Sequence, residues 1–207
     1  MTPDRDAHAI DTLPRLEALL GPLSDASVHK ELPYVHPAYR AMIAASPFAV
    51  LATTGPGGLD ASPRGGAPGF VKALDAHTLL IPDAPGNNRL DTLENIIQTG
   101  QVGLLFLVPG VDETLRVNGT AVLSTDDADL AACADARRVP KLVIRVTVQA
   151  AYLHCAKALM RSALWDPARH VDRAVLPSMG QMLKDQIGGD QPLESQAQML
   201  ARYAAEL

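Results

Sequence analysis

Five apolar, strand-like runs lie close together in the middle of this chain, and their spacing limits the fold more than any other feature. The runs are FAVLATT (48–54), HTLLIPD (77–83), QVGLLFLVPG (101–110), the alternating segment 115–123 and KLVIRVTVQAAYL (141–153). Parallel strands need long crossover connections, so most of these strands must pair antiparallel. A closed or partly closed barrel is the economical way to remove sheet edges. The pattern predicts a mostly β protein with flanking helices (α+β) and argues against a doubly wound parallel sheet.

Helical spacing surrounds and interrupts these strands. Helices are predicted over 11–20, from Pro37 to about Ala45, over the segment LDTLENIIQT before Gly100, over 126–136, from His154 onward, and twice within 175–205. Gly after a helix and Pro in its first turn are the usual boundary signals. We therefore expect an N-terminal helical extension (1–46), a barrel domain (47–170) and a C-terminal helical tail (171–207) packed on the barrel.

Composition excludes several classes of protein. The 207 residues carry a net charge of −5 with only 4% aromatics and no basic stripe, which argues against a nucleic-acid partner. No apolar run approaches the roughly 20 residues of a membrane span, and the polar start does not resemble a targeting segment. Cys133 and Cys155 are more simply two reduced thiols than one disulfide, which favours a cytoplasmic location. The six His residues lack ligand spacing, so we predict no metal site.

Two short segments have the chemistry of an anion site. Arg64 precedes Gly65 and Gly66, which combines a guanidinium with unobstructed backbone N–H groups. The segment PGNNR (85–89) lies between a strand and a helix start, where the amides of Asn87 and Asn88, the guanidinium of Arg89 and the first-turn N–H groups could meet at a phosphate. The alternatives are a solvated turn for Arg64 and a simple N-cap for Asn88. From the residues alone the two interpretations are evenly balanced.

Two further patterns are polar or cationic. Arg116 and Asn118 are two apart on a strand and share a face, which taken alone is more typical of a solvent-exposed face. Lys157, Arg161 and Trp165 are spaced i, i+4 and i+8 and would form one stripe on a helix. A solvated basic face is the usual explanation of such a stripe, whereas the single Trp at its end favours contact with a ligand or partner.

These segments together resemble one family. The motifs SPFAVLATTG, SPRGGAPGFV, TLLIPDAPGNNRLDTLENI, GLLFLVPGVDETLRVNG and HCAKALMRSALWDP occur in that order over roughly residues 30–170. They are similar to those of flavin-binding split-barrel proteins related to pyridoxamine 5′-phosphate oxidase, in particular an uncharacterised bacterial subgroup. Each motif is weak alone, but five in order are specific.

The resemblance implies a six-stranded antiparallel split barrel that forms a homodimer, with FMN in grooves between the subunits and an unknown small-molecule substrate. It places the strand from Arg64 to Val71 along the flavin, Asn88 and Arg89 at the phosphate, and Thr114, Arg116 and Trp165 near the flavin of the neighbouring subunit. Lys157 or Arg161 would stabilise the anionic reduced flavin. The cofactor-binding residues expected on this basis are Arg64, Gly65, Phe70, Val71, Ile81, Pro82, Asn87, Asn88, Arg89, Thr114, Arg116, Lys157, Arg161 and Trp165.

The function implied is an FMN-dependent oxidoreductase for which the sequence assigns no catalytic acid or base. The alternative is a protein that binds or stores a flavin, haem or deazaflavin without turnover, and a third is a structural dimer joined by the cationic stripe. Gly66 and Ala84 depart from the subgroup pattern, where a carboxylate and an Arg are expected. The C-terminal arginine-histidine segment of the true oxidase is not recognisable, so pyridoxamine oxidation is not implied.

Overall fold

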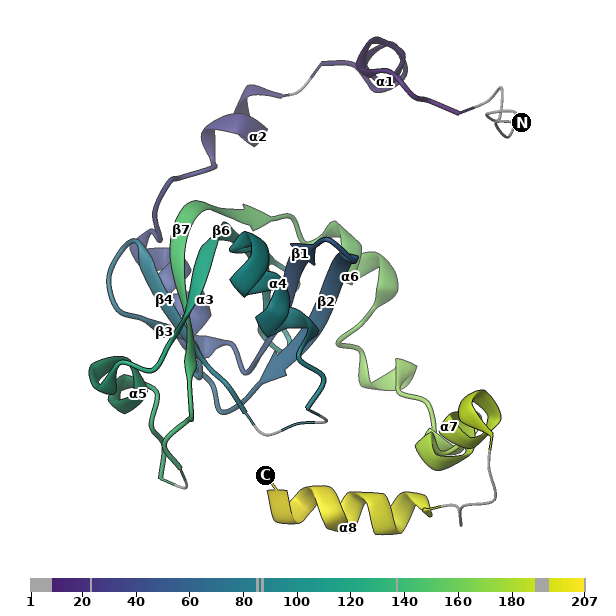
Figure 1. Cartoon of the computed structure of the whole chain (residues 1–207). Coiled ribbons are helices and arrows are strands. Elements are labelled where there is room, and N and C mark those ends of the chain that lie inside the picture. Colours follow the sequence, from purple (N-terminus) through teal and green to yellow (C-terminus); the bar gives the residue numbers. More distant parts are fainter. Residues whose placement is uncertain are drawn as a thin grey trace.

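Seven strands form one antiparallel sheet in the computed structural model, which describes residues 9–22, 24–84, 86, 88–136, 138–188 and 194–206. The sheet curls into a barrel with α4 lying across it (Figure 1). Its strand order is β2-β1-β5-β6-β7-β4-β3. The strands are β1 (Phe48–Gly55), β2 (Gly58–Gly65), β3 (Lys72–Ala73), β4 (Thr78–Pro82), β5 (Gln101–Leu107), β6 (Thr114–Ser124) and β7 (Val143–His154). The predicted antiparallel split barrel with flanking helices is confirmed, with one strand more than the expected six.

The additional strand is β3, which has only two residues. The chain between β2 and β3 is rich in Gly and Pro and passes close to the end of the N-terminal region. Gly69 adopts a φ of 75°, and a Cβ there would lie 3.1 Å from the backbone oxygen of Ala44. Gly69 therefore allows the backbone to approach closely, as the Gly and Pro density predicts.

The barrel interior is aliphatic, as expected from a chain with few aromatics. Alternate residues of each strand point inward, so that Leu51, Leu104 and Val117 are almost completely buried on neighbouring strands. Phe106 is the largest fully buried side chain of the described residues. A smaller cluster of Leu80, Cys133 and Val143 lies outside this core, with Leu130 packed against it.

Helices α3 and α4 pack on the barrel. Helix α3 (Pro37–Ala45) begins with Pro37 in its first turn and buries Tyr39 and Ile43. Helix α4 (Asp91–Thr99) ends at Gly100, whose φ of 68° is left-handed. Side-chain hydrogen bonds tie α4 to the sheet: Thr92 donates to Asp60 at 2.8 Å and Asn95 donates to Thr53 at 3.0 Å.

Helix α5 (Asp127–Ala132) is shorter than the predicted 126–136. Asp126 caps its start by accepting hydrogen bonds from two backbone N–H groups. The chain turns after Ala132 because Asp135 and Arg138 bond reciprocally. The N–H of Asp135 donates to the carbonyl of Arg138, and the N–H of Arg138 donates to the Asp135 carboxylate, both at 3.0 Å. This turn ends the helix and begins the loop that returns to β7.

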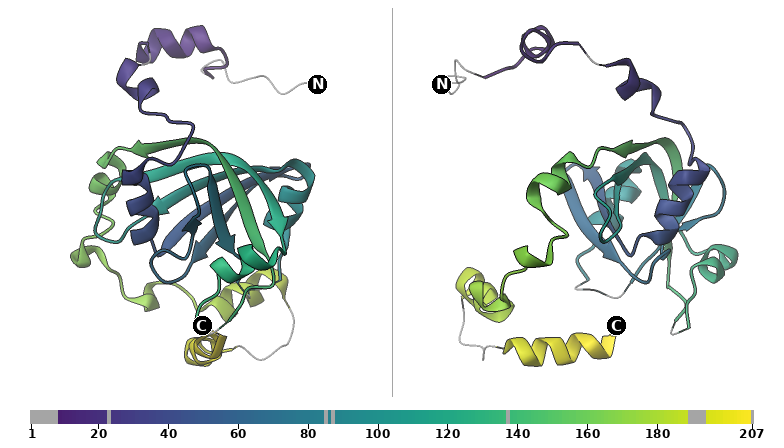
Figure 2. Two further views of the ribbon diagram at one scale, coloured as in Figure 1. Left: turned by 90° about the vertical axis from the view of Figure 1, so that its left-hand side faces the viewer. Right: turned by 180° about the vertical axis from the view of Figure 1, so that it is seen from behind.

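The remaining helices form two arms that leave the barrel on opposite sides, as three views show (Figures 1 and 2). The N-terminal arm holds α1 (Leu13–Leu20) and α2 (Asp25–His29). The C-terminal arm follows β7 and contains α6 (Lys157–Ser162), the 3₁₀ turns η1 (Pro167–Arg169) and η2 (Arg173–Val175), α7 (Met179–Ile187) and α8 (Gln196–Glu206). The two helices predicted within 175–205 are confirmed. Within the described ranges no helix combines the length and apolar character that a membrane span requires.

Candidate functional site

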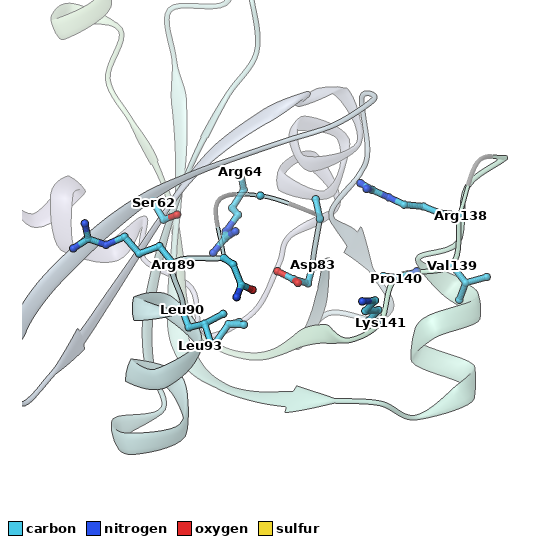
Figure 3. Close-up of a pocket in the computed structure, with 13 residues that line it drawn as sticks. Ser62, Arg64, Asp83, Arg89, Leu90, Leu93, Arg138, Val139, Pro140 and Lys141 are labelled. Carbon is cyan, nitrogen blue, oxygen red and sulfur yellow. The ribbon is translucent and has the colours of Figure 1, made fainter. Parts of the chain in front are cut away.

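A cavity of about 540 Å³ opens at the edge of the barrel, where β2, the β4–α4 connection and the α5–β7 loop come together (Figure 3). Its volume lies within the usual range of small-molecule pockets. The described residues that line it are Ser62, Arg64, Asp83, Ala84, Gly86, Asn88, Arg89, Leu90, Leu93, Arg138, Val139, Pro140 and Lys141. The two segments predicted to form an anion site therefore meet in one cavity.

Strand β2 supplies Arg64 and Ser62 to this cavity because of its register. Arg64 lies opposite Ala49 and Ser62 lies opposite Leu51, and both β1 residues are fully buried on the inner face of the sheet. Directly opposed residues share a face, so Arg64 and Ser62 also point inward. Since β2 is an edge strand, its inner face borders the cavity instead of the packed core.

The side chain of Arg64 has an unused donor. Its Nε is buried and has no hydrogen-bond partner within the part of the chain that the structure describes. A buried polar group without a partner is unfavourable by about 1–3 kcal/mol. Arg64 also lines the cavity, and its guanidinium carries a positive charge, which makes it the residue of the site most clearly suited to an anionic ligand.

The β4–α4 connection forms a second wall. Asn88 adopts a φ of 55°, and α4 starts at Asp91 after an N-cap, Leu90, that offers no side-chain hydrogen bond. Asn88 is therefore not the N-cap, which removes the structural alternative considered for it. Arg89 points away from the cavity centre and is ion-paired with Asp91, which raises the pKa of Arg89. Asn87 lies outside the described residues.

The third wall comes from the α5–β7 loop, which the sequence reasoning missed. Arg138, Val139, Pro140 and Lys141 line the cavity from this loop. The run RRVPK at 137–141 is a local cluster of cations in an acidic chain, and this composition was the available signal. Its position beside the site depends on tertiary packing, which the sequence pattern does not reveal.

The other residues expected along the flavin on this side of the barrel do not line the cavity. Gly65 is exposed at the end of β2 and Phe70 is half-buried. Val71 is buried in the main core, as is Ile81, while Pro82 closes β4. They lie on segments adjoining the cavity walls, and their direct contact with a ligand stays a prediction.

Thr114 and Arg116 lie on β6 and also do not line the cavity of their own chain. Thr114 is buried, with 6% of its surface exposed. The Arg116 guanidinium donates to the Tyr152 hydroxyl at 3.2 Å and lies 5.5 Å from the centre of that ring. Arg116 is thus held against its neighbour on β7 and is not a freely solvated side chain.

The expected stripe of Lys157, Arg161 and Trp165 is interrupted. Helix α6 ends at Ser162, and Ala163 adopts a left-handed φ of 49°, so Trp165 lies beyond the helix. Its indole Nε1 donates to the backbone oxygen of Val111 at 2.9 Å. The structure therefore does not align these three side chains on one helical face, and none of them lines the cavity.

Comparison with solved structures gives neighbours that cover little more than half of this chain. A HupZ protein of group A Streptococcus is 22% identical, with 56% of this chain and 91% of that chain covered and a TM-score of 0.47. An FMN-binding protein from Syntrophomonas wolfei subsp. wolfei is 12% identical over 56% and 83%, with a TM-score of 0.44. The FAD binding protein from Mycobacterium smegmatis is 16% identical over 59% and 98%, with a TM-score of 0.41.

No curated protein matches the chain. A family model described as pyridoxamine 5′-phosphate oxidase matches residues 35–155, which is more than half of the chain and includes all three walls of the cavity. The chain therefore belongs to the pyridoxamine 5′-phosphate oxidase family.

Proposed function

We propose that this protein binds FMN in the cavity between β2 and α4 and acts as an FMN-dependent oxidoreductase on a small molecule. The observation that carries the proposal is Arg64, which lines a cavity of suitable size and whose buried Nε has no partner among the described residues. Family membership supports the same conclusion. A bound flavin would supply hydride or electron chemistry, while the protein supplies placement and electrostatics.

The charges of the lining fit an anionic cofactor. Four cationic side chains border the cavity, Arg64, Arg89, Arg138 and Lys141, against the single carboxylate of Asp83 among the described lining residues. The residues that would hold the phosphate are Arg64 and the start of α4, where first-turn N–H groups have no side-chain cap.

Absorption spectroscopy of the purified protein gives the first test, because a bound oxidised flavin has characteristic visible bands. Protein that is colourless, and whose fluorescence does not respond to added FMN, would contradict the proposal. Mass spectrometry of the cofactor released from a coloured sample would distinguish FMN from FAD, haem or a deazaflavin.

A comparison of FMN with riboflavin tests the role of Arg64. Arg64→Gln removes the charge and should weaken FMN binding by about tenfold to a hundredfold, because a charge-assisted hydrogen bond is worth about 1.5–3 kcal/mol. Riboflavin lacks the phosphate, so its affinity should change little. Arg64→Lys retains the charge without the Nε donor, so its FMN affinity should lie between that of the unmodified protein and that of Arg64→Gln. Thermal unfolding of each variant checks that the fold is retained.

Anaerobic reduction separates turnover from storage. An oxidoreductase should transfer electrons from NADH or NADPH to the bound flavin, which bleaches the visible absorption of the flavin. Flavin that binds but is not reduced by either nucleotide would favour the alternative of a non-catalytic binding protein.

We also propose a homodimer, in which the outer face of the sheet meets a second copy. Val50, Leu105, Arg116 and Tyr152 lie in one row across β1, β5, β6 and β7 and point away from the core, so that apolar side chains and an aromatic ring surround a single arginine in this row. Phe48 is 38% exposed and Leu59 is 88% exposed on the same side of the sheet. Such an uncovered apolar face is typical of interfaces. In this assembly Thr114, Arg116 and Trp165 would come from the partner. Light scattering during size-exclusion chromatography should give twice the 21.9 kDa chain mass.

A further inference from the structure

The loop between α5 and β7 brings two cations to the wall of the cavity that neither predicted motif supplies. Arg138 directs its guanidinium toward the cavity, and the Lys141 side chain lies on the same side (Figure 3). Ser62, Arg89 and Leu90 lie on the other side of this view, with Arg64 and Asp83 between the two groups (Figure 3). Positive charge is therefore distributed across the cavity instead of gathered at one point.

Hydrogen bonds fix this loop at both ends. The Asp135–Arg138 turn holds its start through two bonds of 3.0 Å. At its end, the N–H of Asp83 donates to the carbonyl of Leu142 at 3.1 Å, which joins the exit of β4 to the entrance of β7. Pro140 is buried against the cavity wall. The backbone that carries Arg138 and Lys141 is thus positioned before any ligand arrives, which lowers the entropy lost on binding.

The positive charges of Arg138 and Lys141 are also available to a ligand. Arg89 is engaged with Asp91, whereas the guanidinium of Arg138 and the ammonium of Lys141 make no ion pair or side-chain hydrogen bond with any described residue. Asp83 is the one described carboxylate in the lining and cannot neutralise both. Two cations that border the same cavity and have no partner among the described residues favour the binding of an anion there.

We propose that Arg138 and Lys141 form a second anion subsite, which binds a phosphate or carboxylate group on the opposite side of the cavity from Ser62 and Arg89. The inference deepens the proposed function, on which it rests, because a flavin phosphate at Arg64 would leave this second subsite for another anionic group. That group has two possible sources. It is either the second phosphate of a dinucleotide flavin or an anionic substrate bound beside FMN.

Calorimetric titration of the full chain with inorganic pyrophosphate, first flavin-free and then saturated with FMN, tests the subsite. Arg138→Gln and Lys141→Gln should each weaken pyrophosphate binding by about fivefold to tenfold, since each removes one charge-assisted contact. Arg169→Gln and Lys184→Gln remove exposed cations of the C-terminal arm and serve as matched controls that should leave the affinity unchanged.

Titration with FAD, FMN and riboflavin separates the two sources. If the anion belongs to the flavin, FAD should bind more tightly than FMN. The double variant Arg138→Gln/Lys141→Gln should then bind FAD and FMN with equal affinity. If it belongs to a substrate, FAD and FMN should bind alike, and pyrophosphate should bind the FMN-saturated protein with the same dependence on Arg138 and Lys141. Riboflavin affinity should be unchanged by either variant.

Unchanged affinities for pyrophosphate and FAD in both variants would overturn the subsite. That result is distinguishable from failure of the proposed function, which appears as absent FMN binding in the unmodified chain. Pyrophosphate binding that depends on Arg64 alone would also overturn the subsite, because the anion would then lie at the first position only.

Discussion

The carboxylate of Asp129 on α5 lies 2.6 Å from the guanidinium of Arg145 on β7, and its other oxygen accepts from the Ser124 hydroxyl at 2.9 Å. Asp129 is only 5% exposed, whereas the Arg145 side chain is 41% exposed. The pair joins the helix that precedes the cationic loop to the strand that follows it. It therefore holds the third wall of the cavity on the barrel.

Asp129→Asn should lower the free energy of unfolding by about 1–3 kcal/mol, because it removes the buried negative charge that pairs with the Arg145 guanidinium. Urea denaturation measures the change. Asp127→Asn on the same helix is the matched control, since Asp127 is exposed, and it should remain within about 0.5 kcal/mol of the unmodified protein. Equal effects of the two substitutions would contradict the anchoring role of Asp129.

The two thiols should differ in reactivity. Burial raises the pKa of the Cys133 thiol from 9.0 to about 11, whereas Cys155 is exposed. A thiol-specific reagent at pH 8 should label Cys155 rapidly and Cys133 only after unfolding, because the thiolate is the nucleophile. In the Cys155→Ser variant Cys133 is the only remaining thiol of the sequence. Fast labelling of Cys133 in the folded variant would disprove the expected difference in reactivity.

Stability at high pH should reflect the same shift. Between about pH 9 and 11, folded Cys133 keeps a proton that the unfolded chain releases. Its contribution to the free energy of unfolding is therefore complete below pH 9 and is lost as the pH rises through 11. Cys133→Ala should flatten the fall in stability over this range, as measured by urea denaturation at successive pH values.

Gly119 should not tolerate a side chain. It lies at the register shift in β6, where an added Cβ would collide with the backbone oxygen of Thr147 on β7. Gly119→Ala should lower the free energy of unfolding by about 2 kcal/mol or more, because a backbone atom cannot move aside. Gly57→Ala in the β1–β2 turn meets nothing within 4 Å and is the control. A near-neutral result for Gly119→Ala would show that the two strands can separate locally.

The single Trp provides a test of the proposed dimeric site. If Trp165 lies near the flavin of the partner subunit, its fluorescence should be quenched as FMN is added. The Trp165→Phe variant removes the signal and identifies its source. Tight FMN binding without quenching would support the proposal that the protein binds FMN and would disprove the assignment of Trp165 to the site.

The division into an N-terminal extension, a barrel and a C-terminal tail stays a proposal that limited proteolysis can test. Helix α1 buries none of its residues, and neither do α6 and α7 among the described residues. Trypsin should therefore cut first near Arg15, Lys30 and Arg169, leaving a resistant fragment that mass spectrometry identifies. Helix α3 should stay in that fragment although it precedes residue 47, because its Tyr39 and Ile43 are buried in the barrel core. Early cleavage within the barrel strands would contradict the proposed boundaries.

Five of the seven strands follow from the sequence because each apolar run is bounded by strong turn residues. The strand expected from Arg64 to Val71 is wrong, because β2 ends at Gly65 and the Gly- and Pro-rich chain after it is not a strand until β3. The helix at 37–45 is also predictable, since Pro37 marks its start. The lengths of α5 and α6 are not, because α5 ends at a turn made by Asp135 and Arg138, and α6 ends at a left-handed Ala163. Ala in that conformation is disfavoured by the chain alone and depends on its surroundings.

Some residues of the candidate site could likewise be predicted from the sequence and others could not. Arg64 and Asn88 could be predicted as partners because both follow or end a strand near Gly-rich turns, and the structure brings both to the cavity. Arg138 and Lys141 lie more than forty residues further along the chain and reach the cavity only through the packing of α5 on β7. Local sequence patterns do not predict such contacts between segments that are far apart in the chain.

Pro63 in the middle of β2 has a consequence for how copies of this protein associate. β2 is an edge of the sheet, and an exposed edge can template the addition of a strand from another molecule. Proline has no N–H to donate and its ring obstructs an incoming backbone, so strand-to-strand growth toward fibrils is blocked at this position. The same residue that interrupts the edge beside Arg64 thus protects the open seam of the barrel from aggregation while leaving it accessible to small ligands.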